Sequence, residues 1–215
     1  MEKVVIIDYG MGNLHSVHSA LMQVGVNKID LCISQEIDEI KNADKIVFPG
    51  QGAAKDCMRA LTNLGLVDIV KEAAKEKPFL GICMGMQVLL NHSDENEGVP
   101  CLDMYPGTVK SFAKNISSTA TRQLKVPHMG WNNIHASLDH PLWAGITQDS
   151  YFYFVHSYFV EPENKSLIAG TTGYGIEFAS VIASDKVFAM QCHPEKSGDN
   201  GLALLSNFLA WDGDY

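Results

Sequence analysis

The stretch that decides the fold is Phe79-Leu80-Gly81-Ile82-Cys83-Met84-Gly85-Met86-Gln87. An apolar run ends there in Gly-x-Cys-x-Gly and continues into a helix-forming segment. This pattern is typical of a nucleophile elbow, a tight strand-to-helix turn that lifts one side chain above the edge of a sheet. The flanking glycines let neighbouring backbone pass without a Cβ clash. We therefore expect Cys83 at a helix N-terminus, where the peptide dipoles favour a nucleophilic thiolate.

The first half of the chain alternates apolar runs with amphipathic segments. Strands are expected over residues 4–8, 28–33, 45–48 and 78–82. Helices are expected over residues 13–24 with Asn13 as the cap, 36–41, 53–74 with a break near Gly65, and 84–91. Strands that alternate with helices form a parallel sheet covered by helices on both faces. The sequence predicts an α/β fold with an open, mostly parallel sheet flanked by helices.

The second half is richer in β-forming residues. After a polar loop over residues 93–98, strands are expected over residues 108–112, 151–160, 166–172, 178–183 and 186–191. Some of these strands should extend the sheet in the antiparallel sense, and residues 202–211 should form a closing helix. No internal repeat, low-complexity segment or linker interrupts the pattern, so we expect a single domain over residues 1–215.

Composition narrows the class of protein. The chain has 215 residues, 46% hydrophobic and 19% charged, with a net charge of −9 and no basic stripe, which argues against a nucleic-acid partner. No apolar run approaches the roughly 18 residues that a membrane span requires. The five cysteines are an odd number without a C-x-x-C pair, which argues against a disulfide framework and a metal site. We expect a reducing, cytoplasmic location.

A nucleophilic cysteine needs a base, and His193-Pro194-Glu195 follows an apolar strand. Proline at position 194 favours an extended backbone at His193. Residues two apart in an extended chain share a face, so the carboxylate of Glu195 can orient the imidazole of His193. In parallel sheets the sites form beyond the carboxyl ends of the strands, where Cys83 and His193 both fall.

The turn Pro49-Gly50-Gln51-Gly52 also follows an expected strand. Its two glycines allow the backbone to present an amide N–H, and the N–H groups of Gln51 and Met84 are candidates for an oxyanion hole.

Structural roles compete with these functional ones. A lone cysteine after a strand is usually a small buried apolar residue, and a lone histidine is usually structural or solvated. These roles are expected for Cys32, Cys57, Cys101, Cys192, His15, His18, His92, His135 and His140. The segment Gly10-Met11-Gly12 is a partial match to a dinucleotide-binding loop but lacks the third glycine, which favours a simple tight turn.

At these motifs the chain resembles the class I, triad-type glutamine amidotransferases. The resemblance covers essentially the whole chain and is strongest to the glutaminase subunits of imidazole glycerol phosphate synthases. It is carried by Gly81 to Gln87, by Ile7-Asp8-Tyr9-Gly10-Met11-Gly12-Asn13-Leu14, by Pro127-His128-Met129-Gly130-Trp131-Asn132, by Tyr153-Phe154-Val155-His156-Ser157-Tyr158 and by His193-Pro194-Glu195-Lys196-Ser197.

The resemblance implies a glutaminase. Cys83 would attack the side-chain amide of L-glutamine, with His193 as the base oriented by Glu195, and the thioester would be hydrolysed to glutamate. The N–H groups of Gln51 and Met84 would stabilise the oxyanion. The residues implied in binding glutamine are Gly50, Gly52, Gln87, His156, Ser157 and Tyr158.

The resemblance also implies a partner. Ammonia would pass to a (β/α)8-barrel cyclase subunit in a heterodimer of histidine biosynthesis, with no cofactor or metal in this chain. The residues expected to face the cyclase are Trp131, Asn132, Tyr153 and Lys196. Core packing is the competing role for Trp131 and Tyr153, and a solvated charge is the competing role for Lys196.

Two positions depart from the family pattern. The family's turn usually reads Pro-Gly-Val-Gly, and Gln51 takes the place of the valine here. Cys192 takes the place of the aromatic residue that usually precedes the histidine. Three alternatives therefore stay open. They are a related amidotransferase that serves another synthase such as one forming amidino sugars, a non-catalytic docking subunit, and an unrelated cysteine hydrolase on a similar sheet.

Overall fold

The computed structural model describes residues 1–115 and 124–215. Within these residues the core is a mixed sheet with strand order β2-β1-β3-β4-β14-β13-β11-β7-β5-β6. Its parallel part consists of β1 (Glu2–Ile7), β2 (Ile29–Ser34), β3 (Lys45–Gly50), β4 (Phe79–Cys83) and β14 (Val187–Met190). The predicted α/β class with a mostly parallel sheet is confirmed, and the strand nearest the C-terminus lies beside the strand that leads into Cys83.

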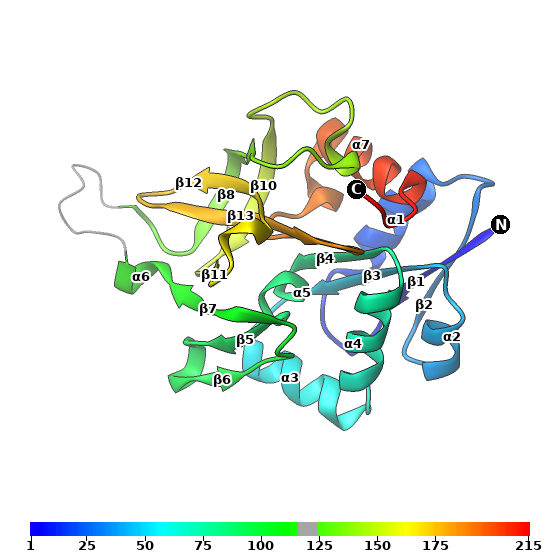
Figure 1. Cartoon of the computed structure of the whole chain (residues 1–215), viewed down its shortest axis with the longest axis horizontal. Helices are drawn as coiled ribbons and strands as arrows, with labels where there is room; N and C mark the ends of the chain where they lie inside the picture. The colour runs from blue at the N-terminus through cyan, green and yellow to red at the C-terminus, as the bar shows by residue number, and fades with distance from the viewer. Residues whose placement is uncertain (116–123) are drawn as a thin grey trace.

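Helices cover both faces of the parallel part (Figure 1). They are α1 (Leu14–Val24), α2 (Ile37–Lys41), α3 (Ala54–Asn63), α4 (Val67–Glu76), α5 (Met84–Gln87) and α7 (Gly198–Ala210). The short helix α6 (Phe112–Asn115) lies away from the parallel strands. Alternation along β1 explains the two layers. Val4 and Ile6 belong to the apolar cluster that includes α1 and α7, whereas Val5 and Ile7 belong to the cluster that includes α3 and α4.

Antiparallel strands extend the sheet beyond β14, as expected for the second half. They are β5 (Leu90–Ser93), β6 (Val99–Pro100), β7 (Tyr105–Ser111), β9 (His135–Ala136), β11 (Tyr158–Pro162), β12 (Ile168–Gly173) and β13 (Glu177–Ser184). Only β5 and β7 run parallel within this part. A separate two-stranded ribbon pairs β8 (His128–Asn133) with β10 (Tyr151–His156).

The prediction of a helix over residues 84–91 is wrong about where the helix ends. It ends at Gln87, and the chain continues directly into β5. The carbonyl groups of Val88, Leu89 and Leu90 accept hydrogen bonds from the amides of residues 102–105. Pairing with a segment that follows later in the chain therefore satisfies the groups that a longer helix would have used.

Other boundaries were also predicted incorrectly. The strand expected over residues 151–160 is two strands broken at Ser157, and the ribbon strand β8 was not predicted. Asn13 precedes α1, but its side chain makes no capping hydrogen bond; its backbone carbonyl accepts from Val17 instead.

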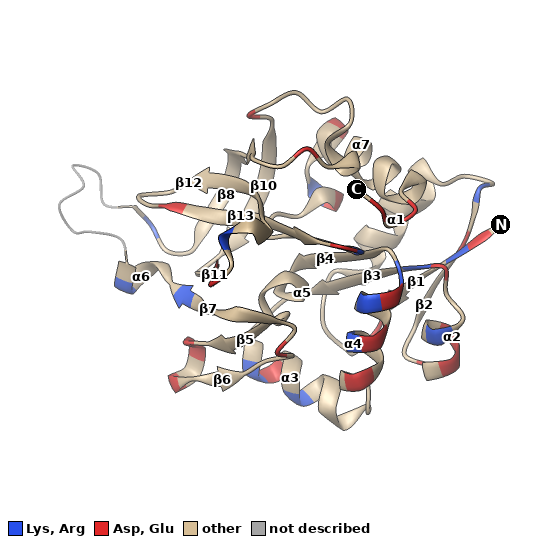
Figure 2. Ribbon diagram, viewed as in Figure 1, with Lys and Arg blue, Asp and Glu red and all other residues tan. Residues whose placement is uncertain are grey.

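Figure 2 shows charged residues of both signs along helices α2, α3 and α4. Along α4, lysines alternate with acidic residues while Val70, Ala73 and Ala74 are buried. None of the helices in the described part of the chain is long and apolar enough to cross a membrane.

Candidate active site

Cys83 occupies a strained turn between β4 and α5. Its backbone angles are φ 56° and ψ −109°, in the positive-φ region that costs energy for any residue with a Cβ. A Cβ placed on Gly85 would lie 1.9 Å from the carbonyl oxygen of Phe48, and one on Gly81 would lie 2.8 Å from the Cβ of Ala189. The two glycines are thus required because β3 and β14 press against the turn from either side.

His193 reaches the same edge of the sheet from β14. The register pairs Met190 with Ile82, so both strands end level with each other. Nδ1 of His193 lies 2.8 Å from Oε1 of Glu195, whose side chain is fully buried. The backbone at His193 is held on both sides, because its N–H donates to Tyr153 O (2.9 Å) and its carbonyl accepts from Ser197 Oγ (2.6 Å).

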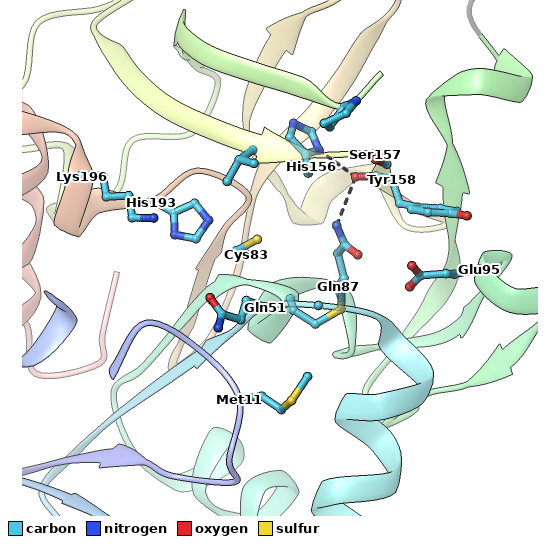
Figure 3. Close-up of a pocket in the computed structure, with 14 residues that line it drawn as sticks. Met11, Gln51, Cys83, Gln87, Glu95, His156, Ser157, Tyr158, His193 and Lys196 are labelled. Atoms are coloured by element: carbon cyan, nitrogen blue, oxygen red, sulfur yellow. Dashed lines mark hydrogen bonds between the residues drawn. The ribbon is translucent and has the colours of Figure 1, made fainter. Parts of the chain in front are cut away.

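The charges around His193 favour its protonated form. Burial of the ring by itself lowers the pKa, but the Cys83 sulfur and the Glu195 carboxylate outweigh burial and raise the pKa of His193. Since Nδ1 is held by Glu195, Nε2 is the nitrogen that can exchange a proton with the sulfur. Figure 3 shows the ring of His193 and the sulfur of Cys83 beside one another on the same cavity. The structure thus favours a protonated imidazole at His193 beside the Cys83 sulfur.

The turn that follows β3 is held from below by two side chains. Tyr9 donates its hydroxyl hydrogen bond to Pro49 O (2.9 Å), and the Cys57 thiol donates to Gln51 O (3.6 Å). Gly52 has φ +86°, and a Cβ on Gly50 would lie 2.4 Å from the Tyr9 hydroxyl. Cys57 is buried as expected, and burial raises its pKa to about 12. This thiol therefore stays protonated and acts as a donor that holds the turn.

Cys83 opens onto a pocket of about 550 Å³ (Figure 3). Ten residues singled out from the sequence line this pocket: Gln51, Gly52, Cys83, Met84, Gln87, His156, Ser157, Tyr158, His193 and Lys196. Gly50 and Glu195 do not line it, because Gly50 is covered by Tyr9 and Met84 and Glu195 lies behind His193. The pocket thus gathers side chains from segments that are far apart in the sequence.

Four lining residues were not anticipated: Met11, Glu95, Pro127 and Val155. Oε2 of Glu95 accepts a hydrogen bond from the Ala54 N–H (2.7 Å) at the start of α3. Glu95 lies in a segment that was expected to be only a polar loop, and no local pattern distinguishes it from the neighbouring acidic residues. Met11, Pro127 and Val155 each belong to a segment that carries the family resemblance, and that membership was the available signal for them.

The amide NH2 group of Gln87 makes both of its hydrogen bonds within the protein. Its Nε2 donates to Tyr158 O (3.1 Å) and to Gln191 Oε1 (2.9 Å), whereas its Oε1 is buried without a hydrogen-bond partner. Any polar contact from Gln87 to a ligand therefore has to use Oε1, since both donor positions are occupied.

His156 turns its ring away from the cavity centre into a polar network. Its Nδ1 donates to Tyr158 O (2.7 Å), which leaves Nε2 to accept from Nδ1 of His128 (2.8 Å). Burial lowers the pKa of His128 to about 4 and that of His156 to about 3. Both rings are therefore neutral at pH 7, and His156 contributes its backbone to the pocket.

The residues expected to face a partner lie on or beside the β8–β10 ribbon. Trp131 is 56% exposed, which excludes core packing, and it pairs across the ribbon with Tyr153. Lys196 Nζ lies 6.0 Å from the Tyr153 ring centroid, so these three side chains form one patch. Asn132 differs, because its amide nitrogen binds Gly173 O (3.0 Å) and His128 Nε2 (3.2 Å) and so points into the protein.

Comparison with known proteins agrees with this geometry. The family model for class-I glutamine amidotransferases matches residues 5–211, and the chain belongs to that family. The chain is 54% identical over 210 residues to the imidazole glycerol phosphate synthase subunit HisH of Hydrogenovibrio crunogenus, covering 98% of this chain and 97% of the relative. It is 48% identical over 213 residues to the subunit of the same name from Pseudomonas putida, covering 99% of each.

Solved structures share the fold at low sequence identity. PurLQS from Thermotoga maritima superposes with a TM-score of 0.67 at 15% identity, covering 97% of this chain and 98% of that one. The crystal structure of a glutamine amidotransferase superposes with the same TM-score of 0.67 at 16% identity, covering 92% and 94%. At such identities the likeness establishes the architecture alone.

Proposed function

We propose that this protein is the glutaminase subunit of an imidazole glycerol phosphate synthase and hydrolyses L-glutamine to glutamate and ammonia. The observation that carries the proposal is the strained Cys83 elbow beside the buried His193–Glu195 pair. The relatives named above, which match along nearly their whole length, support the choice of synthase.

In the proposed reaction Cys83 is the nucleophile and His193 transfers the protons. The Cys83 thiolate attacks the side-chain carbonyl carbon of glutamine, and the carbonyl electrons move to oxygen. When the intermediate collapses, the C–N bond breaks and Nε2 of His193 gives its proton to the departing ammonia. His193 then takes a proton from water, which attacks the thioester and releases glutamate and the thiolate. Glu195 keeps the ring oriented throughout, because it holds Nδ1.

The oxyanion of this intermediate needs backbone donors. We assign the N–H groups of Gln51 and Met84, both of which belong to residues lining the pocket. Two such donors in a site shielded from water stabilise the transition state more than the ground state.

Glutamine also carries an α-ammonium and an α-carboxylate. Glu95 is a carboxylate that lines the pocket and is the group suited to the ammonium, while the backbone of His156, Ser157 and Tyr158 is placed for the carboxylate. Gly52 lines this site, Gly50 lies beneath it in contact with Tyr9 and Met84, and Gln87 contributes its Oε1.

The ammonia is delivered to a (β/α)8-barrel cyclase that docks over the mouth of the pocket. Trp131, Tyr153 and Lys196 form the exposed patch beside that mouth and are the contact residues we propose, with Asn132 supporting the ribbon from within. Residues 1–215 form a single domain in this proposal, with both apolar layers packed on one sheet. Its five free cysteines are suited to the reducing cytoplasm.

The test is a glutaminase assay with and without the cyclase, comparing the wild-type protein with Cys83→Ala. We expect glutamate release in the wild type, increased by the cyclase, and a loss to background in the variant. Binding of the variant to the cyclase should persist, measured by size-exclusion chromatography. Equal rates of glutamate release in both proteins would overturn the proposal.

A further inference from the structure

Gln191 is a buried polar residue that the mechanism above does not use. It follows β14, and its relative exposure is 0%. Its backbone N–H donates to Ser180 O (2.8 Å), which fixes the main chain at this point. Gln191 and His193 both lie beside Cys83: Nε2 of Gln191 is 3.7 Å from the Cys83 sulfur, and His193 lines the same pocket as Cys83.

The orientation of this amide group is determined by its neighbours. Tyr158 O can only accept, so the atom of Gln87 that faces it must be the donor Nε2. The same Nε2 faces Gln191 at 2.9 Å, so Gln191 must present its acceptor Oε1 there. The other end of the Gln191 amide, which faces the sulfur, is therefore the NH2 group. A single backbone carbonyl thus sets the direction of two side-chain amides in series.

We propose, building on the function above, that Gln191 is a further catalytic residue, whose amide donates a hydrogen bond to the Cys83 sulfur and stabilises its thiolate. A donor binds an anion more strongly than a neutral thiol, so the contact favours ionisation. His193 gives and takes the proton, whereas the amide of Gln191 does not titrate. The amide of Gln191 is therefore a donor to the sulfur both when the thiolate attacks glutamine and when it re-forms on release of glutamate.

The same contact positions the nucleophile. Cys83 is held in a strained backbone conformation, and a donor on the side of Gln191 limits where the sulfur can lie. Hydrogen bonds connect the carbonyl of Tyr158, which lines the pocket, to the amide of Gln87, then to the amide of Gln191, and finally to the Cys83 sulfur. Gln191 contacts the sulfur and Gln87 but does not line the pocket, so its loss should reduce the rate of reaction more than it weakens glutamine binding.

The experiment removes the donor while keeping side-chain volume, with Gln191→Met and Gln191→Leu. The matched control is Thr172→Val, which deletes a buried hydroxyl hydrogen-bonded to Ser180 Oγ (2.8 Å) away from the pocket. Alkylation of Cys83 by iodoacetamide is followed from pH 5 to pH 9 by mass spectrometry of its peptide. Glutamate release by the complex with the cyclase gives kcat and KM. Circular dichroism verifies that each variant is folded.

Loss of a hydrogen bond to a charged group predicts a fall of about ten- to a hundredfold in alkylation of Cys83 at pH 7, with the pH profile moved to higher pH. The kcat should fall by a similar factor in both Gln191 variants, and KM should change less than about twofold. Thr172→Val should keep wild-type alkylation. Met and Leu differ in shape, so the two variants are expected to differ in stability. If Gln191 had a purely structural role, the loss of kcat in each variant would follow its loss of stability.

The inference is overturned if either folded Gln191 variant alkylates Cys83 at the wild-type rate, or if only KM changes. It fails separately from the proposed function. A wild-type protein that releases no glutamate refutes the function, whereas an active wild type with equally active Gln191 variants refutes this inference alone.

Discussion

The two halves of the molecule bring their parts of the site together by different means. The parallel half positions Cys83 by shape, since backbone from β3 and a side chain from β14 press on the glycines of the elbow. The second half positions His193 by hydrogen bonds to Glu195, Tyr153 and Ser197. Shape holds a strained residue in place, whereas hydrogen bonds also set protonation and charge. The difference suggests that substitutions in the first half will mainly affect stability and those in the second half mainly activity.

Glu195→Gln should give the largest effect. The amide nitrogen can face Nδ1 of His193 and favour the wrong tautomer, and the carboxylate charge that raises the pKa of His193 is lost. We expect kcat for glutamate release to fall by about 10²- to 10⁴-fold with the fold retained. Steady-state kinetics with the cyclase present, together with a thermal melt, measure both quantities. A variant with near wild-type kcat would show that hydrogen bonding in the second half does not control activity.

Gly85→Ala should mainly cost stability. The added Cβ would overlap the Phe48 carbonyl oxygen at 1.9 Å, and that oxygen belongs to backbone in the centre of the sheet. We expect the free energy of unfolding to fall by about 3 kcal/mol, measured by urea denaturation. Gly173→Ala is the matched control, because a Cβ there meets nothing within 4 Å. Equal stability of the two variants would remove the claim that shape holds the elbow.

The buried histidines of the second half should make stability depend on pH. Burial lowers the pKa of His128 and of His140 to about 4 and that of His156 to about 3, below an unfolded value of about 6.5. The unfolded chain then binds more protons below pH 6.5, so stability falls as pH decreases from 6.5 toward 4. Each of these histidines contributes a slope of up to about 1.4 kcal/mol per pH unit.

His193 does not oppose this slope. Its pKa is raised in the folded state, so its stabilising contribution is complete below pH 6.5 and is lost only as pH rises above that value. Urea denaturation at pH 6.5, 6.0, 5.5 and 5.0 measures the slope. Stability that stays level or increases over this interval would contradict the assignment of three neutral, buried imidazoles.

Lys196→Ala should have the smallest effect on the isolated protein. The side chain is exposed and contacts the Tyr153 ring at 6.0 Å, which is worth about 0.5–1 kcal/mol at an exposed site. We expect unfolding to change by no more than that, while stimulation of glutamate release by the cyclase falls several-fold. The ratio of rates with and without the cyclase is the measurement. An unchanged ratio at saturating cyclase would exclude Lys196 from the docking patch.

Much of the fold could be predicted because its signals are local. Each of the first four strands is a short apolar run followed by a helical pattern, and Gly-x-Cys-x-Gly marks the elbow without reference to any other segment. The early end of α5 could not be predicted in this way. The carbonyls of residues 88–90 bond to residues 102–105, and a pairing partner of that kind lies outside any local window.

The candidate site divides in the same manner. The sequence by itself determined Cys83, His193 and Glu195 as candidates, since each lies in a short motif whose spacing reflects backbone geometry. Only the tertiary structure decided that Trp131 is exposed, that Glu95 lines the pocket and that Gln191 faces the sulfur. The physical reason is that burial and the direction of a hydrogen bond depend on which strands become neighbours. No single stretch of sequence specifies the partner of a side chain that lies a hundred residues away.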